Sequence, residues 1–351
     1  MGRDGQVSIS PSTEQSPMTA LRVAVVGQGL IGRQRAEALL GIPGARLVAT
    51  VDPCANTSLR PFIPHHACLN DLSVESYDAA VIAVPHDIAG KLAAMSLRAG
   101  KPILLEKPLG LTASEAHELE QLADAVPTPS FVGYNYRYLP TIRELISIVE
   151  RGRLGELRSI DMLIGHGGHP RSAEGWKLNA ARAGGGVLLD PGVHLLDILL
   201  RIAPKASCCA AEATRGFWPT GIEEDVTLTF RTERLLASVR VSHIRWINTF
   251  RIEVFGEEGY AIAEGRGGNY GPMTIRVGKR WGWFEHEGMG QRETEDVSDF
   301  GNRDESLHEE LVAVIAAWQT GSPSADALHP ATMAEARAVS DLCDRLYARI
   351  H

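Results

Sequence analysis

The feature that most constrains this chain is a glycine-rich turn close to its start. Six consecutive residues follow the apolar run Leu21–Val26 in the pattern G-x-G-x-x-G: Gly27, Gln28, Gly29, Leu30, Ile31 and Gly32. In a strand–turn–helix unit, the first glycine makes the tight turn, the second lets the backbone approach a pyrophosphate, and the third permits close packing of helix on strand. The helix N-terminus then offers amide donors to the anion. The pattern predicts a dinucleotide-binding unit, with a purely structural turn as the alternative.

An acidic residue further along the chain extends this pattern. Asp52 follows the next apolar run, Ala45–Val51, and lies twenty positions beyond the last glycine. A carboxylate there accepts hydrogen bonds from the adenosine ribose 2′-OH and repels a 2′-phosphate, which favours NAD over NADP. Three arginines, Arg33, Arg35 and Arg60, are close enough in sequence to approach a 2′-phosphate, so NADP stays open.

Short apolar runs alternate with helix-length segments up to about residue 140. The further expected strands are Ala79–Val84, Ile103–Leu105 and Phe131–Gly133. The expected helices are Leu30–Leu40, Asp87–Ala99 and Ala113–Ala125. Short, fully apolar strands separated by helices indicate a parallel sheet covered on both faces. We therefore predict an α/β fold that begins with a doubly wound Rossmann domain over residues 20–140.

The pattern changes after residue 140. A helix is expected over Thr141–Glu150, a strand over Leu157–Ile164 and a helix over Val193–Ile202. Alternating runs then follow at Val226–Phe230, Leu236–Val241, Arg251–Phe255, Tyr260–Ala263 and Thr274–Val277. Strands joined by short turns indicate a mainly antiparallel sheet that is polar on one face. With helices expected at Glu305–Gln319 and Ala331–Ile350, residues 141–351 are predicted to form a second α/β domain.

Composition excludes several classes of protein. The formal net charge of −8 and the lack of a Lys/Arg stripe argue against nucleic acid or anionic lipid as a partner. No apolar run reaches the ~18 residues that a membrane span needs. The 5 cysteines show no C-x-x-C spacing, which favours a reducing, cytoplasmic location. Residues 1–19 carry no apolar signal core, so we expect a disordered tail.

Two opposite charges follow the expected strand Ile103–Leu105. Glu106, Lys107 and Pro108 stand where ligands bind in an open α/β sheet, outside the carboxyl ends of the strands. A lysine at this edge, next to a carboxylate, can keep its charge and hold a substrate oxygen. A surface turn is the alternative, and the Lys107–Pro108 bond is a candidate for the cis form.

The run 184–197, G-G-G-V-L-L-D-P-G-V-H-L-L-D, is the most informative later segment. We expect Asp190 to be a helix N-cap with Pro191 at the first helical position. His194 lies one turn further on, so a carboxylate and an imidazole would share one space, which suits proton abstraction near neutral pH. Asp197 completes a set of metal-ligand types, but no second His or Cys has metal-ligand spacing, so we expect no metal. A cap beside a buried histidine is the structural alternative.

Together these motifs resemble the Gfo/Idh/MocA oxidoreductases, the family of glucose–fructose oxidoreductase and inositol 2-dehydrogenase. The resemblance spans about residues 20–351 and includes Y-N-Y-R at 134–137. It implies hydride transfer between NAD(P) and a hydroxyl-bearing carbon of a sugar, cyclitol or sugar derivative. It also implies an open sheet in the second domain that forms a homodimer or homotetramer.

The resemblance assigns roles to individual positions. It implies Lys107 as the substrate-polarising cation, Asp190 as the carboxylate that orients the imidazole, and His194 as acid/base. It places Glu106, Pro85 and Asn135 at the cofactor. It implies substrate contacts from Arg137, Trp176 and Lys177. Apart from the resemblance, His166 and His169 lie on the glycine-rich loop before Trp176 and are substrate-contact candidates, because loops at a domain cleft carry specificity.

The chain departs from the family pattern at two places. After Pro85, Ala89 stands where the family often has a histidine, and Pro53–Ser76 is poorly helical where a family helix is usual. Two other functions stay open: a glycosidase that oxidises its substrate transiently with NAD, and a non-catalytic dinucleotide sensor. The sensor is disfavoured because Lys107, Asp190 and His194 are all present.

Overall fold

The apolar runs of the first third form a seven-stranded sheet. The computed structural model describes residues 20–54, 63–168, 175–280, 295–323 and 329–350. The strand order is β15-β6-β5-β4-β1-β2-β3, and every neighbouring pair is parallel except β15 with β6. The strands are β1 (Leu21–Val26), β2 (Ala45–Val51), β3 (His65–His66), β4 (Ala79–Ile82), β5 (Ile103–Glu106), β6 (Phe131–Gly133) and β15 (Ala331–Thr332). This confirms the predicted Rossmann sheet.

Three helices connect these strands as expected. They are α1 (Leu30–Leu39), α2 (His86–Arg98) and α3 (Ala113–Asp124). The Thr112 hydroxyl caps α3 by accepting a hydrogen bond from the amide of Glu115 at 3.2 Å. In the described part of 53–76, the chain forms β3 and two short 3₁₀ helices, Leu69–Asp71 and Val74–Ser76, in place of a long helix.

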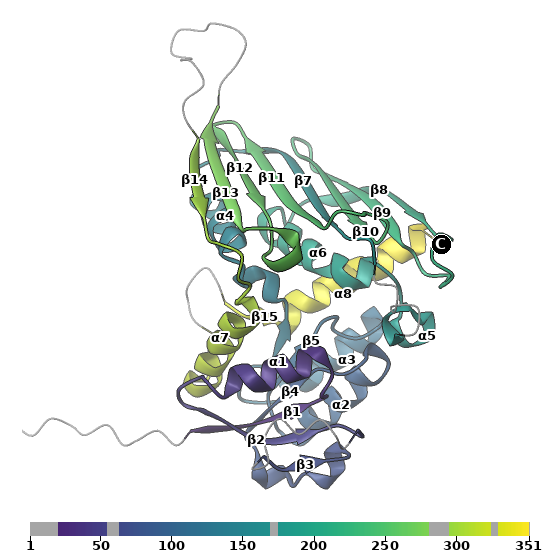
Figure 1. Ribbon diagram of the computed structural model, residues 1–351, viewed down its shortest axis with the longest axis vertical. Helices are drawn as coiled ribbons and strands as arrows, with labels where there is room; N and C mark the ends of the chain where they lie inside the picture. The colour runs from purple at the N-terminus through teal and green to yellow at the C-terminus, as the bar shows by residue number, and fades with distance from the viewer. Residues whose placement is uncertain (1–19, 55–62, 169–174, 281–294, 324–328, 351) are drawn as a thin grey trace, which may run out of the picture.

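A second sheet of eight strands forms the other half of the molecule. Its order is β14-β13-β12-β11-β7-β10-β9-β8, with β7 and β10 parallel and the other pairs antiparallel. The strands are β7 (Leu157–Gly165), β8 (Ser207–Thr214), β9 (Asp225–Arg231), β10 (Leu236–Ser242), β11 (Thr249–Gly256), β12 (Gly259–Glu264), β13 (Thr274–Lys279) and β14 (Asp296–Asp299). One face packs on α4 (Pro140–Glu150), α6 (Val193–Ile202) and α8 (Met333–Ile350), as Figure 1 shows.

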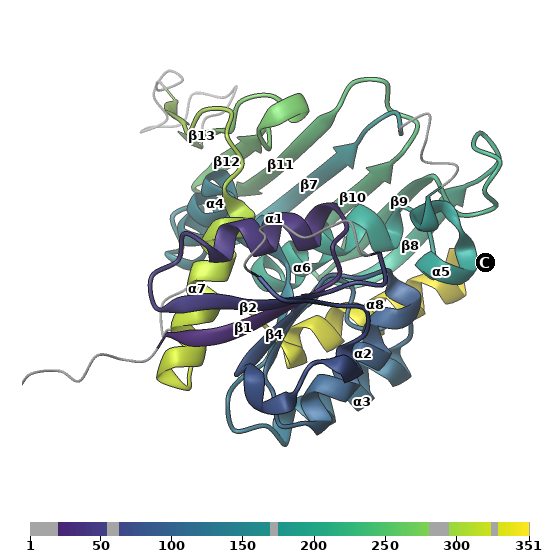
Figure 2. The same ribbon diagram turned by 60° about the horizontal axis from the view of Figure 1, so that its bottom comes forward.

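The end of the chain returns to the first sheet. Helix α7 (Ser306–Thr320) lies against α1, and Figures 1 and 2 show the two helices side by side. Trp318 and Leu311 of α7 are buried with Val23 of β1 in one apolar cluster. Strand β15 then extends the first sheet, and α8 packs between α3 and β8. A division at residue 140 separates the two sheets up to α7. Beyond that point, α7 and β15 return to the first sheet, although they belong to residues 141–351.

One apolar stretch, Ala180–Ile202, has the length and hydropathy of a membrane span. However, 83% of its most apolar window is buried inside the protein. It includes the short helix α5 (Ala180–Ala183) and the core helix α6. A buried core helix passes the same test, so this stretch is weak support for a membrane span.

Candidate active site

The glycine-rich turn and the second sheet border one cavity of about 1100 Å³. Pockets for single small ligands run to about 1000 Å³, so this cavity has room for a cofactor and a substrate together. The predicted site residues in its lining are Gly27, Gly29, Leu30, Ile31, Asp52, Pro85, Glu106, Lys107, Asn135, His166, Trp176, Lys177, Asp190 and His194. Gln28, Gly32 and Arg137 lie outside this lining.

The geometry of the turn explains why these glycines are needed. Gly27 has a φ of +94°, and a Cβ there would overlap the backbone of Ala83. A Cβ on Gly32 would overlap the Gly27 carbonyl oxygen, so this glycine allows α1 to pack on the turn. At Gly29 a Cβ would meet nothing within 4 Å, because that side of the backbone opens into the cavity. The turn thus leaves space for a ligand beside the N-terminus of α1.

Asp52 is fixed at the rim of this turn. Its carboxylate accepts hydrogen bonds from the backbone amides of Gln28 at 2.7 Å and Cys54 at 2.9 Å. Of the arginines that kept NADP open, Arg33 is exposed and outside the lining, and Arg35 is buried in ion pairs. Arg60 lies outside the described residues. Among the described residues, the edge of the cavity beside the glycine-rich turn therefore carries the carboxylate of Asp52. This carboxylate fits a dinucleotide with a free ribose 2′-OH.

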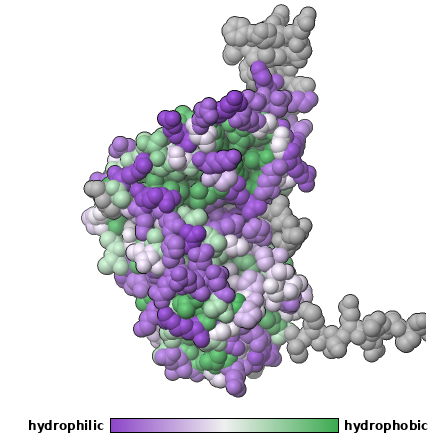
Figure 3. Space-filling view, turned by 180° about the vertical axis from the view of Figure 1, so that it is seen from behind, coloured by the Kyte–Doolittle hydropathy of each residue, from purple (hydrophilic) through white to green (hydrophobic). Residues whose placement is uncertain are grey.

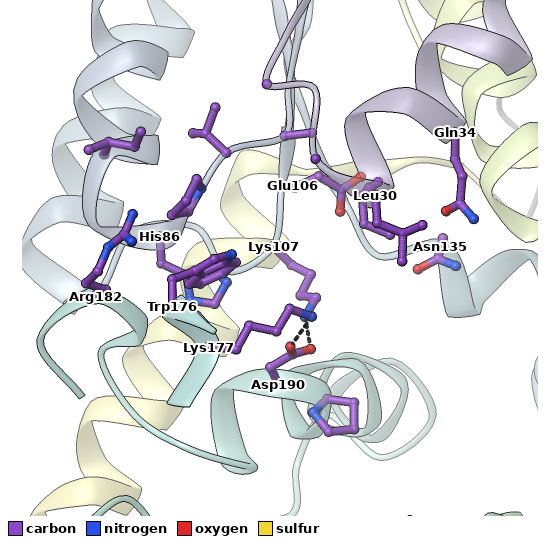
Figure 4. A pocket seen from close by; sticks show the side chains of 18 of the residues that line it. Leu30, Gln34, His86, Glu106, Lys107, Asn135, Trp176, Lys177, Arg182 and Asp190 are labelled. Atoms are coloured by element: carbon purple, nitrogen blue, oxygen red, sulfur yellow. Dashed lines mark hydrogen bonds and ion pairs between the residues drawn. The ribbon is translucent and has the colours of Figure 1, made fainter. Parts of the chain in front are cut away.

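Two lysines share one carboxylate at the centre of the cavity. Asp190 forms ion pairs with Lys107 and, at 2.6 Å, with Lys177, and Figure 4 shows both side chains converging on it. Burial alone would raise the pKa of Asp190, but the two ammonium groups hold it well below its usual range. Burial lowers the pKa of Lys107, and the field of Asp190 raises that of Lys177. The cluster therefore carries one positive charge in excess.

His194 lies in this cluster without a hydrogen bond to Asp190. Its ring stacks on Tyr136 at 3.9 Å with an interplanar angle of 8°, and its Nδ1 is buried with no partner among the described residues. Burial, reinforced by the charge of Lys107, holds the pKa of His194 well below its usual value. The imidazole is therefore neutral at physiological pH.

This geometry corrects the expected role of Asp190. Its backbone is extended, with φ −148° and ψ 100°, and α6 begins only at Val193. Asp190 is therefore neither an N-cap nor one helical turn from His194, and its carboxylate orients the lysines instead. The peptide bonds before Pro108 and Pro191 are both cis.

Arg137 is the other residue that the structure places elsewhere. It is 1% exposed and donates two hydrogen bonds to the carboxylate of Asp197, at 2.5 and 2.7 Å. It also pairs with Glu335 of α8 at 3.1 Å. The expected substrate contact does not fit this geometry, because the guanidinium pairs with Asp197 and Glu335 and lies outside the cavity lining. The same pair takes Asp197 away from Asp190 and His194.

Several cavity residues were not among the predicted site residues. The Nδ1 of His86 lies 2.9 Å from the Ala183 carbonyl oxygen and donates a hydrogen bond to it, and the ring meets Trp176 edge-on. The lining also contains Tyr136, Trp218, His243, Arg266 and Tyr270. Of these, Tyr136 had a signal in the sequence, since it lies within Y-N-Y-R. His169 lies outside the described residues.

Comparison with known proteins decides the family. Residues 21–134 match the model of the oxidoreductase family with an NAD-binding Rossmann fold, and residues 142–262 match the GFO/IDH/MocA C-terminal domain. The chain belongs to the Gfo/Idh/MocA family. It is therefore an oxidoreductase with an NAD(P)-binding domain, as the motifs predicted, and the two matches meet near residue 140.

Relatives in this family are named as dehydrogenases and reductases of sugars and cyclitols. The chain is 25% identical over 270 residues to inositol 2-dehydrogenase of Rhizobium meliloti, which covers 73% of this chain and 78% of that protein. Other curated relatives are matched over about half their length.

Two solved structures share the fold over 94% of the chain. Levoglucosan dehydrogenase with NADH and levoglucosan has a TM-score of 0.78 at 18% identity, with 96% of it covered. A 3-ketoreductase from Actinomadura kijaniata with NADP and TDP-benzene has a TM-score of 0.77 at 17% identity, with 98% covered.

Proposed function

We propose that this oxidoreductase transfers hydride between NAD and a secondary hydroxyl or ketone of a sugar, cyclitol or sugar derivative. The observation that carries the proposal is the continuity of one cavity from the glycine-rich turn to Lys107 and His194. Aromatic rings of Trp176 and Trp218 in the same lining suit the apolar face of a sugar ring. The names of the relatives support this substrate class. Asp52 supports the preference for NAD.

The residues of the cavity divide the chemistry. The bound nicotinamide supplies the hydride acceptor. Lys107, held by Asp190, stabilises negative charge that develops on the substrate oxygen. His194, neutral because it is buried among cations, accepts the hydroxyl proton during oxidation. Lys177 and His166 line the same cavity, and in this proposal they contact other substrate hydroxyls. Such contacts would orient the substrate, and the rate depends on that orientation.

The test is a panel of sugars, inositols and their keto forms, followed at the absorbance band of NADH with NAD and NADP in parallel. We expect reduction of NAD with at least one polyol, and loss of that signal in K107M. Release of an aglycone from a glycoside, with cofactor that stays bound and no net NADH, would instead identify the glycosidase. Tight NADH binding without turnover of any compound would favour the sensor.

We further propose that the outer face of the second sheet forms a homodimer or homotetramer. The residues that point away from the helices include the exposed Leu236 and Arg240 and the partly exposed Leu163. Figure 3 shows hydrophobic residues mixed with hydrophilic ones on the upper part of the molecule, where this sheet lies. Light scattering tests this: we expect an oligomer for the wild type and a monomer for L163E, and a monomeric wild type contradicts it.

A cytoplasmic location is part of the proposal. No disulfide links the cysteines, all of which lie in the described part of the chain, as expected in a reducing compartment. Fractionation of cells that express the tagged chain tests this location, and recovery in a membrane or secreted fraction contradicts it.

A further inference from the structure

A stacked column of side chains leads from the second sheet to His194. The guanidinium carbon of Arg266 lies 4.6 Å from the ring centre of Tyr270 and 4.9 Å from that of Tyr136. Tyr136 in turn stacks on His194 at 3.9 Å, nearly parallel. Arg266 is thus in contact with both tyrosines, and Tyr136 lies between it and the imidazole.

The backbone holds Arg266 firmly in this place. It lies between β12 and β13, next to Gly265, whose φ is +74° and whose amide donates to the Phe250 carbonyl at 3.0 Å. A Cβ on Gly265 would overlap the carbonyl oxygen of Pro272, so the loop approaches its own return segment closely. The amide of Gly268 also donates to the Asn302 carbonyl at 3.0 Å. The guanidinium is therefore presented by a tightly bonded loop.

The ion pair that the structure describes at Arg266 is a loose one. The arginine side chain is 24% exposed, and the carboxylate of Asp304 is 3.8 Å away. Asp304 also accepts hydrogen bonds from the amide and hydroxyl of Ser306, at 3.0 and 2.6 Å. The Nε of Arg266 is buried without a hydrogen-bond partner among the described residues. Burial lowers the pKa of Arg266, but Tyr136, Tyr270 and Asp304 outweigh this and raise it on balance, so the guanidinium keeps its charge.

We propose that Arg266 is a positioning residue for His194, which acts through Tyr136: its flat guanidinium keeps the Tyr136 ring parallel to the imidazole, and its charge favours the neutral imidazole. This inference rests on the proposed function, because that function makes His194 the proton acceptor. Orienting the imidazole was the role expected of Asp190, whose carboxylate pairs with Lys107 and Lys177 instead. In this proposal Arg266 has that orienting role.

The groups around His194 determine whether its pKa is raised or lowered. The ring of Tyr134 meets the imidazole edge-on at 5.8 Å and is nearly perpendicular to it, whereas the ring of Tyr136 is nearly parallel to it. After burial, the cations Lys107, Arg266 and Lys177 lower the pKa of His194, and Asp190 raises it. The two lysines are paired with Asp190, whereas the nearest carboxylate that the structure describes at Arg266 is the loose one of Asp304.

The distance from Arg266 to His194 sets the size of the effect. The two stacking distances place the guanidinium within about 9 Å of the imidazole. A unit charge at that distance and at intermediate dielectric shifts a pKa by about one pH unit. The loss of the charge should therefore be measurable as a shift of about that size.

Two substitutions separate the charge of Arg266 from its shape. R266Q keeps a flat group without charge, and R266K keeps the charge without the flat group. R98M removes an exposed arginine on α2 and serves as the control for net charge. Circular dichroism and urea unfolding check that each variant is folded.

The first readout needs no substrate. The protein is labelled with ¹³C at histidine Cε1, and H194Q assigns the resonance of His194. We expect His194 to titrate well below its usual range in the wild type and R98M, and about one pH unit higher in R266Q but not in R266K. R266K should shift the neutral resonance, because Tyr136 moves against the imidazole when the flat group is lost, whereas R266Q should leave that resonance close to its wild-type position. If the His194 resonance keeps its wild-type position and its wild-type pKa in both R266Q and R266K, the proposal is overturned.

The second readout uses a substrate found with the panel. The acidic limb of kcat/KM should move up by about one pH unit in R266Q and stay in place in R266K. An unmoved limb with a raised KM at every pH would mean that Arg266 binds the substrate directly, and it overturns the positioning role. If no compound is turned over although the resonance behaves as expected, the proposed function fails and the control of His194 by Arg266 stands.

Discussion

A buried cluster of two carboxylates and one guanidinium offers a sharp test of the electrostatics of this fold. Arg35 of α1 pairs with Glu106 at 2.8 Å and with Glu310 of α7, and Arg35 and Glu310 are completely buried. Burial and the neighbouring charge of Glu106 raise the pKa of Glu310 to about 7, although Arg35 opposes this. The cluster thus carries an excess negative charge above neutral pH, and we predict that E310Q stabilises the protein there.

The magnitude follows from linkage between protonation and folding. The pKa of Glu310 is raised from 4.5 in the unfolded chain to about 7 in the fold. The stability that protonation of Glu310 adds is fully present below the pKa of the unfolded chain. It is lost as the pH rises through the pKa of the folded protein, and the total loss is about 3 kcal/mol. The new amide leaves a donor where Oε1 has no partner among the described residues, which costs about 1 kcal/mol. We therefore expect a net gain of about 2 kcal/mol at pH 8.

The assay is urea unfolding of wild type and E310Q between pH 5 and pH 8. E309Q, an exposed neighbour on α7 with a loose pair at 3.7 Å, is the control and should stay within about 0.5 kcal/mol of wild type. At pH 5 the wild-type carboxyl is protonated in the fold, so the advantage of E310Q should vanish. Greater stability of the wild type at pH 8, or an equal difference at every pH, would refute the reasoning.

Other substitutions test the site residue by residue. K107M and H194Q should bind NADH normally in a fluorescence titration yet lose ~100-fold or more in kcat, and wild-type turnover in either contradicts its role. D52A should weaken NADH binding by about tenfold while NADPH binding improves, whereas an unchanged ratio would exclude Asp52 from the ribose. R137M should lower stability by about 3–5 kcal/mol because it leaves Asp197 buried and unpaired, and a raised KM at wild-type stability would restore the substrate contact.

Elements with a strong local signal were predicted from the sequence. The glycine-rich turn, the strand end at Glu106 and the helix over Val193–Ile202 all follow from residues adjacent in sequence. The short strands β3 and β15 had no such signal, because each pairs over two residues and depends on a neighbour. The return of α7 to α1 was missed for the same reason, since nothing in its sequence shows which sheet it covers.

The site was predicted where chain neighbours carry it and missed where distant segments meet. Asp190 and His194 are close in sequence, which suggests a helical pair, but the extended backbone at Asp190 turns the carboxylate to Lys107 and Lys177. The stacking partner of His194 is instead Tyr136, which comes from a distant segment of the chain. Spacing in sequence predicted residues that line one cavity and assigned one contact between them incorrectly.

The helix that closes the cavity shows why the first unit alone is an incomplete site. Ser306 at the start of α7 accepts a hydrogen bond from Asn135 at 2.7 Å, and the carbonyl of Leu307 accepts one from Arg35 at 2.8 Å. Leu307 also lines the cavity. Because buried polar groups without partners are unfavourable, the wall beside the glycine-rich turn is complete only when α7 docks, and cofactor binding should be coupled to that docking.

The side chain of Ser306 offers a direct test of this coupling. S306A removes the acceptor that holds Asn135 at the cavity wall and changes no residue of the glycine-rich turn. The loss of one buried hydrogen bond is worth about 1 kcal/mol, so we expect NADH to bind about fivefold more weakly in a fluorescence titration. The exposed variant E309Q on the same helix should bind NADH as the wild type does. Equal binding by S306A and wild type would show that the glycine-rich turn holds the cofactor without help from α7.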